Sequence, residues 1–114
     1  MTIFHLVWRP DWDRDSGSAV YRPPSLAIEG FVHATREADK LLESAGLFFP
    51  LDRTDDLLIV HLDETQVGAP VRYEDPGVGH LFPHIYGPVS LAAVTAVSVM
   101  DRGPDGWRLP DGFG

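Results

Sequence analysis

The first apolar segment of the chain alternates in the manner of a strand with two different faces. It runs from Ile3 to Trp8, is rich in β-branched and aromatic residues, and ends before Pro10, which favours extended structure. Successive side chains of a strand point to opposite faces, so His5 shares one face with Ile3 and Val7. The other face receives the larger apolar residues Phe4, Leu6 and Trp8. The pattern therefore predicts a histidine within an apolar strand face.

One segment has the periodicity of an amphipathic helix. Its apolar residues are three or four positions apart, which puts them on one helix face; they are Ala38, Leu41, Leu42 and Ala45. Thr35 precedes the segment as a candidate N-cap, and Gly46 follows it as a C-terminal signal. We therefore expect the main helix at about residues 36–45.

Five further segments are predicted to be strands, the first of them the short strand at residues 31–34 before the helix. The run from Leu57 to Leu62 is apolar throughout, which is typical of a strand covered on both faces. Shorter extended segments are expected at residues 71–74, 82–86 and 94–100. Many short strands with one clear helix indicate an α+β fold with a mostly antiparallel β-sheet.

The chain of 114 residues has the size of one domain. Its end differs in composition, because the last residues are dense in Gly, Pro and Asp, with Trp107 and Leu109 as the expected anchors. We therefore expect a single domain over residues 1–101 and a peripheral C-terminal tail over residues 102–114.

The composition limits the cellular compartments and the classes of partner that fit this chain. There is no cysteine, which excludes disulfides, thiolate metal sites and cysteine nucleophiles. The first residues lack the features of a signal peptide and no apolar run approaches about 18 residues, so we expect a cytoplasmic protein that does not enter a membrane. The formal charge of −8 disfavours a nucleic-acid partner, because a protein that binds phosphates along a nucleic acid needs a basic face. The oligomeric state is left open.

Familiar catalytic signatures are absent, since the sequence has no phosphate-binding loop, dinucleotide fingerprint, zinc-protease motif or nucleophile elbow. Five histidines remain as candidates, at positions 5, 33, 61, 80 and 84. For His5 and His33 two interpretations stay open: core histidines bonded to the backbone, or two sides of one shared pocket. We expect both to be flanked by apolar side chains, His33 by Phe31 and Val32. Glu29 either braces the strand of His33 or is a plain surface carboxylate.

The segment around Pro83 carries the other candidate groups. His80 and His84 have the spacing of a metal-binding pair on a helix, but Pro83 disfavours a helix there, so no metal site is expected. In an extended segment His84 and Tyr86 point the same way and could face a ligand. Alternatively, Tyr86 packs on the core next to a turn.

Taken in order, these segments resemble a bacterial family, the domain-of-unknown-function family 952. The resemblance runs to about Met100 and is most specific in Glu29-Gly-Phe-Val-His-Ala-Thr35 and Phe82-Pro-His-Ile-Tyr-Gly-Pro88. That family in turn resembles a distant branch of the ADP-ribosyltransferase fold, closest to the RNA 2′-phosphotransferases, which use NAD. The resemblance implies an ADP-ribosyltransferase-like split β-sheet.

The same resemblance implies roles for single residues. The transferases have one histidine in the first strand and a second in a Val-His-Leu-Ser segment, and His5 and His33 are similar to them, which assigns both to catalysis. His5 is followed by Leu6 and Val7 where the transferases have Gly-Thr, and no residue matches their catalytic glutamate. Only the roles of His5 and His33 rest on a motif match. The further candidate ligand-binding residues, chosen for their residue types and positions, are Tyr21, Ser25, Glu29, Arg72, His84 and Tyr86.

The chemistry of NAD cleavage suits these residue types. The nicotinamide–ribose bond breaks through an oxocarbenium-like state, so a site needs groups on the ribose hydroxyls, an aromatic face for the leaving ring and cations for the pyrophosphate. Tyr21 or Tyr86 would contact the ring, and the phosphates would meet Arg22, Arg36 or Arg72. We therefore expect a domain that binds NAD or a related small-molecule nucleotide, with or without transfer of ADP-ribose to a small acceptor. The alternative is a non-catalytic ligand-binding or protein-interaction domain that keeps the fold.

Overall fold

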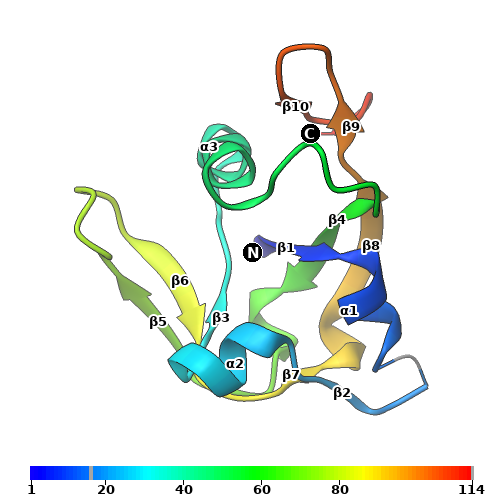
Figure 1. Ribbon diagram of the computed structural model, residues 1–114. Helices are drawn as coiled ribbons and strands as arrows, with labels where there is room; N and C mark the ends of the chain where they lie inside the picture. The colour runs from blue at the N-terminus through cyan, green and yellow to red at the C-terminus, as the bar shows by residue number, and fades with distance from the viewer. Residues whose placement is uncertain (16, 114) are drawn as a thin grey trace.

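Short strands and three helices make up the protein, of which the computed structural model describes residues 1–15 and 17–113 (Figure 1). The strands are β1 (Thr2–Trp8), β2 (Val20–Tyr21), β3 (Val32–His33), β4 (Leu57–Asp63), β5 (Val71–Glu74), β6 (Phe82–Ile85), β7 (Val89–Ser90), β8 (Val94–Val99), β9 (Asp101–Arg102) and β10 (Trp107–Arg108). The helices are α1 (Arg9–Asp13), α2 (Pro24–Glu29) and α3 (Ala38–Phe48), with 3-10 turns η1 (Glu64–Gln66) and η2 (Leu91–Ala93).

The central sheet has the strand order β1-β4-β8, and both strand pairs are antiparallel. Its middle strand, β4, pairs with β1 from Leu57 opposite Trp8 to Asp63 opposite Thr2. One core packs on the face of Leu58 and Val60, and a second core packs on the face of Leu57 and Ile59. The prediction of a strand covered on both faces is confirmed.

Alternation along β1 sends its residues to these two cores as expected. Ile3 and Val7 belong to the first core, together with Tyr21 of β2 and Ile85 of β6. Trp8 belongs to the second core, which lies beneath α3 and includes Leu41 and Ala45 of that helix. The face that His5 shares with Ile3 and Val7 is therefore buried.

A second three-stranded sheet has the order β3-β6-β5. Its strands pair antiparallel, and the β5–β6 hairpin extends away from the central sheet (Figure 1). Two small two-stranded pairs, β2–β7 and β9–β10, complete the structure. The described chain is thus an α+β protein with mostly antiparallel strands, as the sequence predicted, and these strands lie in separate sheets.

The main helix begins and ends later than predicted, at Ala38 and Phe48 rather than at about 36 and 45. Thr35 does not cap it, because the N-cap position falls on Glu37, two residues later, while the backbone of Thr35 pairs with Phe4. Gly46 lies inside the helix, which ends instead before Pro50, where the following proline disfavours helical backbone.

The short helix α2 was not predicted. Pro23 and Pro24 exclude a helix interior, but Pro24 is the first helical residue, a position where the missing N–H costs nothing. The helix ends at Gly30, which has a φ of 85° and donates its N–H to the carbonyl of Leu26 over 2.9 Å. This left-handed turn favours glycine and directs the chain into β3.

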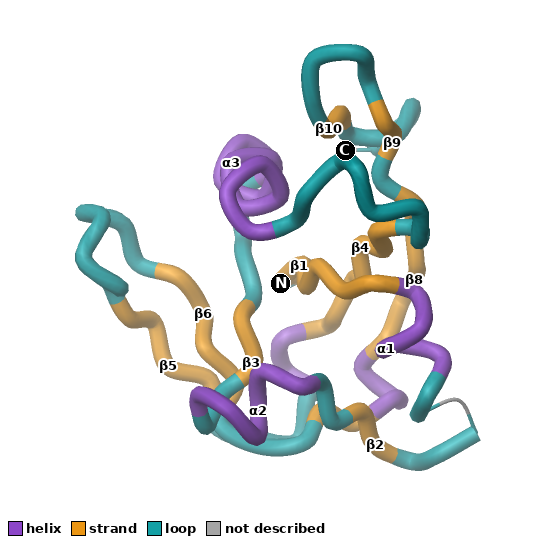
Figure 2. Tube along the Cα trace, viewed as in Figure 1, coloured by secondary structure: helices purple, strands orange, loops and turns teal. Residues whose placement is uncertain are grey.

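The C-terminal residues cover the same side of the central sheet as α3 (Figure 2). Trp107, an expected anchor, is only 6% exposed, and its Nε1 donates to the carbonyl of Phe49 over 2.8 Å. Phe113, which we did not expect as an anchor, packs on Phe4 with ring centroids 5.0 Å apart. The described part of the predicted tail therefore helps to close the second core, and residue 114 lies outside the described residues.

Within the described residues, no helix is both long and apolar enough to cross a bilayer.

The burial of Trp107 predicts that the tail contributes to stability. Replacement by alanine removes a large buried ring and should lower the free energy of unfolding by about 3 kcal/mol. Trp107→Phe keeps an apolar ring but loses the bond to the Phe49 carbonyl, and should cost about 1 kcal/mol. Urea unfolding followed by circular dichroism measures both. If Trp107→Ala unfolds at the same urea concentration as the unaltered protein, the tail is energetically peripheral.

Candidate functional site

The two sheets meet where the chain after β3 crosses β1. Phe4 and Thr35 exchange two backbone hydrogen bonds, of 2.7 and 2.8 Å, in an isolated antiparallel bridge. Beside this bridge, the Nδ1 of His5 lies 2.6 Å from the carbonyl oxygen of His33. A carbonyl can only accept a hydrogen bond, so Nδ1 carries the proton. The bridge and the imidazole together fix β3 against β1.

The second ring nitrogen of His5 is also engaged inside the protein. Its Nε2 lies 2.7 Å from the hydroxyl of Tyr21. Since Nδ1 holds the ring proton, Nε2 accepts this bond from the tyrosine. Burial lowers the pKa of His5 from 6.5 to about 4, because a charged imidazolium would lose its hydration. His5 is therefore neutral near pH 7, and neither ring nitrogen is free for a ligand while these bonds hold.

Tyr21 belongs to the core rather than to an accessible site. It is 1% exposed and packs edge-on against Trp12, with ring centroids 4.9 Å apart. Burial raises the pKa of its hydroxyl. The predicted contact of Tyr21 with a ligand ring is therefore wrong for this arrangement, and Tyr21 supports His5 instead.

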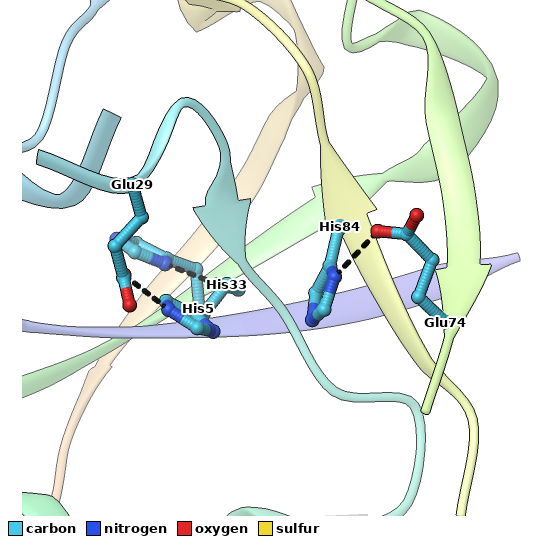
Figure 3. A network of polar contacts seen from close by, with 5 residues as sticks. All are labelled: His5, Glu29, His33, Glu74 and His84. Atoms are coloured by element: carbon cyan, nitrogen blue, oxygen red, sulfur yellow. Dashed lines mark hydrogen bonds and ion pairs between the residues drawn. The ribbon is translucent and has the colours of Figure 1, made fainter. Parts of the chain in front are cut away.

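His33 and Glu29 form an accessible pair at the start of β3. The turn at Gly30 brings the end of α2 next to β3, and the Nε2 of His33 lies 2.5 Å from the Oε2 of Glu29 (Figure 3). Their side chains are 53% and 44% exposed. The interpretation of His33 as a core histidine is wrong, because Val32 is the residue of β3 that points into the core. Of the two interpretations for Glu29, the bracing of His33 is the one that fits this contact.

A second carboxylate–histidine pair lies on the next strands. His84 of β6 is directly opposite His33 on β3, and their ring centroids are 5.4 Å apart. The Oε1 of Glu74 accepts hydrogen bonds from the hydroxyl of Tyr86 over 2.5 Å and from Nδ1 of His84 over 2.8 Å. These bonds, that of Tyr86 first, lower the pKa of Glu74, while the same contact raises the pKa of Tyr86. The prediction that His84 and Tyr86 point the same way is confirmed.

Arg72 and Phe31 extend this second cluster. Arg72 is opposite His84 on β5, and its guanidinium lies 5.1 Å from the ring centroid of Tyr86. Phe31 stacks on His84 at 4.2 Å and also touches the edge of His33 at 4.8 Å. Phe31 thus joins the two carboxylate–histidine pairs on the same face of the β3-β6-β5 sheet.

A cavity of about 540 Å³ lies beside the first pair. Strands β1, β3 and β6, helices α2 and α3 and the β5–β6 loop all contribute to its wall. Four predicted site residues line it: His5, Ser25, Glu29 and His33. The other predicted residues, Tyr21, Arg72, His84 and Tyr86, are not among its lining residues. The predicted site residues therefore fall into two groups: those that line the cavity, and a neighbouring cluster in which Phe31 contacts His84 and Tyr86.

Several residues of the cavity were not recognised from the sequence. Its apolar wall includes Phe4, Leu6, Phe48, Phe49 and Phe82, and its polar wall adds Thr35, Lys40, Glu43 and Ser44. The alternation of β1 could have indicated Phe4, because it lies next to His5 and on the face of α3. Glu74 could have been found by the same rule, since it lies two positions from Arg72 on one strand face.

Among the described residues, no three His, Asp or Glu side chains gather in an arrangement that could hold a metal ion.

The lowered pKa of His5 predicts a particular dependence of stability on pH. As pH falls, the unfolded chain takes up a proton at the ordinary pKa of 6.5, whereas the folded chain takes it up only at about 4. The contribution of His5 to the free energy of unfolding is therefore complete above pH 6.5 and is lost as the pH falls from 6.5 to about 4. The loss should reach about 3 kcal/mol at the acid end.

Urea unfolding across this pH range checks the prediction. His5→Gln should show a shallower loss of stability than the unaltered protein, and the contribution of His61, whose pKa is also lowered by partial burial, is common to both. Ring-proton NMR gives an independent value. A pKa of His5 at or above 6.5 in the folded protein would contradict the buried, neutral arrangement.

Comparisons with known proteins agree with the fold. The sequence pattern of the family described as Protein of unknown function (DUF952) matches residues 6–97. No curated protein matches the chain. The crystal structure of protein CC0527 from Caulobacter crescentus has a TM-score of 0.80 and 22% sequence identity, covering 94% of this chain and 92% of that chain.

Two further structures of the same Caulobacter protein are similar. A crystal structure of a double mutant gives a TM-score of 0.79, 22% identity and coverage of 94% and 92%. A solution NMR structure gives 0.75, 22% identity and coverage of 93% and 90%. At this identity the likeness shows a shared fold. The family pattern spans most of the chain, including both motifs that were most specific in the sequence, and the protein therefore belongs to the DUF952 family.

Proposed function

We propose that the cavity between α3 and the strands β1, β3 and β6 binds NAD or a related nucleotide, in an ADP-ribosyltransferase-like manner. The observation that carries the proposal is that His5, Ser25, Glu29 and His33, selected from separate segments of the sequence, line one cavity. A volume of about 540 Å³ lies in the range of small-molecule sites, about 300–1,000 Å³.

The apolar wall suits an aromatic ring. Phe4, Phe49 and Phe82 approach from β1, from the end of α3 and from β6, and such side chains bind flat rings by stacking or edge contacts. A nicotinamide or adenine ring would bury its faces here, while its ribose would reach the polar wall.

The polar wall offers groups for a ribose and for its cleavage. His33 and Glu29 are exposed enough to exchange their mutual bond for bonds to hydroxyl groups. A carboxylate beside the ribose would also stabilise the positive charge that develops at the sugar carbon when the bond to the ring breaks. In this proposal Glu29 supplies negative charge, His33 binds a hydroxyl, and His5 holds the backbone of His33 in place.

The charges around the cavity limit how a dinucleotide could lie. Lys40 is the single Lys or Arg among the described lining residues, and it pairs with Glu43 over 3.2 Å. Arg72 lies over Tyr86, and Arg36 lies over Tyr73 at 5.5 Å. The ring and ribose would therefore occupy the cavity, with the phosphates near Lys40 or in solvent. This placement of Arg72 does not support the pyrophosphate contact expected from the sequence.

A non-catalytic binding domain is the second candidate. It is favoured by His5, whose two ring nitrogens are both bonded within the fold. Such a histidine can support a site without touching a ligand. Binding and bond cleavage must therefore be measured separately.

Binding is tested by isothermal titration with NAD and with ADP-ribose. His33→Ala and Glu29→Gln should each weaken binding about tenfold, equivalent to about 1.4 kcal/mol, because each loses a polar contact in the cavity. His80→Ala is the matched control, since His80 forms a similar pair with Glu37 at 3.2 Å but does not line the cavity. If the folded protein binds neither NAD nor ADP-ribose at millimolar concentration, the proposal is rejected.

Cleavage is tested by the release of nicotinamide from NAD. If the cavity is catalytic, the protein releases nicotinamide and Glu29→Gln slows the release about a hundredfold or more, because the negative charge beside the sugar carbon is lost. The variant would bind NAD only about tenfold more weakly. Tight binding without any release of nicotinamide would favour the non-catalytic candidate.

A further inference from the structure

The outer edge of β8 is an uncovered strand edge with unusual composition. The strand order β1-β4-β8 leaves one side of β8 without a neighbouring strand among the described residues. Its sequence, from Val94 to Val99, is Val-Thr-Ala-Val-Ser-Val. It has no charged residue and no proline, two of the devices that keep exposed strand edges from pairing. A third device, a bulge, occurs only at the start of β8, where the register shifts between Val94 and Ala96.

Within the described residues, the edges at β1 and β5 differ from that of β8. At the opposite edge of the central sheet, β1 is joined to the chain after β3 through Phe4 and Thr35. At the outer edge of the second sheet, β5 carries Arg72 and Glu74. Among these edges β8 is the one that combines an open backbone with a wholly uncharged sequence.

The register shows which backbone groups of β8 are free. The N–H of Met100 donates to the carbonyl of Leu57 over 2.9 Å, and Ser98 is opposite Ile59 two positions away. In an antiparallel pair, hydrogen-bonded positions alternate with positions whose N–H and C=O point outward. Val97 and Val99 occupy those alternate positions, opposite Val60 and Leu58. Their backbone groups therefore point away from β4.

The side chains of the same two residues are also uncovered. Val97 is 44% exposed and Val99 is 41% exposed, on the sheet face of Val60 and Leu58. Free backbone groups and exposed β-branched side chains thus coincide at the same positions. An added strand would satisfy both at once.

We propose that β8 is a dimerisation edge that pairs antiparallel with β8 of a second copy of the chain. The strand is self-complementary when the two copies are centred on Ser98. Val97 then lies opposite the partner's Val99, and the reciprocal pair forms by symmetry, so the outward N–H and C=O groups of both valines find partners. The four valine side chains form one stripe across the junction.

A second copy fits this edge better than a charged peptide. None of the seventeen Asp and Glu residues lies on β8, so two acidic chains can meet here without opposing like charges. The two central sheets would become one continuous sheet of six strands. The contact is small, so the dimer is expected to be weak, with a dissociation constant of about 10–500 μM.

Sedimentation equilibrium over a wide range of protein concentration tests the proposal. The protein should show a monomer–dimer equilibrium, and Val97→Lys should raise the dissociation constant about tenfold or more, because it brings a charge to the edge. Val97→Thr keeps a β-branched, uncharged residue and should change the constant by no more than about threefold. Circular dichroism confirms that the variants are folded. A protein that stays monomeric at millimolar concentration overturns the proposal.

A residue-level measurement identifies the edge itself. In amide hydrogen exchange, the N–H groups of Val97 and Val99 should become slower to exchange as the protein concentration rises, whereas that of Ser98 should be protected at every concentration. Val97→Pro removes only an outward N–H and should abolish the dimer while leaving the β4–β8 pairing intact. A dimer in which Val97 and Val99 exchange at rates independent of concentration would place the interface elsewhere and overturn the proposal.

Discussion

The arrangement of the molecule depends on the contact between β1 and the chain that follows β3. Two backbone hydrogen bonds between Phe4 and Thr35 join the sheets, and the buried imidazole of His5 adds a third bond to the carbonyl of His33. The hydroxyl of Tyr21 completes the hydrogen bonding of that imidazole. A histidine inside an apolar strand face is costly unless both nitrogens are satisfied, and here both are. The contact therefore helps to hold the two sheets together, beside the apolar core that Val32 and Ile85 share with Ile3 and Val7.

The cavity follows from this junction. Beyond Thr35 the chain turns into α3, which packs on the central sheet through Leu41 and Ala45, while the β5–β6 hairpin extends from the second sheet (Figure 1). The space between these elements is lined by residues of both. Because His5 fixes the backbone of His33, the exposed His33–Glu29 pair has a defined position at the edge of this space. The buried His5 thus positions His33, and His33 is the histidine that a ligand could reach.

The spacing of apolar residues predicted the elements whose burial repeats with the period of a strand or a helix. The two faces of β1, the doubly covered β4 and the existence of the main helix all follow from the spacing of apolar residues. The boundaries of α3 did not, because the pairing of Thr35 with Phe4 depends on residues about thirty positions away and overrides a favourable capping residue. The burial of Trp107 is likewise a tertiary effect, since nothing in a segment rich in Gly, Pro and Asp indicates which core it will cover.

The sequence predicted only part of the candidate site, because local patterns do not show how distant segments pack. The motifs identified the right segments, yet they could not distinguish the buried His5 from the exposed His33, because a strand pattern does not say which face another sheet covers. Tyr21 was predicted to contact a ligand, whereas its hydroxyl donates a hydrogen bond to Nε2 of His5. Glu74 was not assigned to the site, although alternation puts it on the same strand face as Arg72; its bonds to His84 and Tyr86 form only when β5 pairs with β6.

The proposed nucleotide site is the cavity beside the β1–β3 junction. The most direct measurement is a two-dimensional NMR spectrum of the isotopically labelled protein recorded during addition of NAD. If NAD occupies this cavity, the largest shifts fall on Glu29, His33 and Thr35 and on the side of α3 that carries Lys40 and Ser44. Shifts that are absent, or that are confined to residues outside the cavity such as Tyr73 and His80, would contradict the proposal.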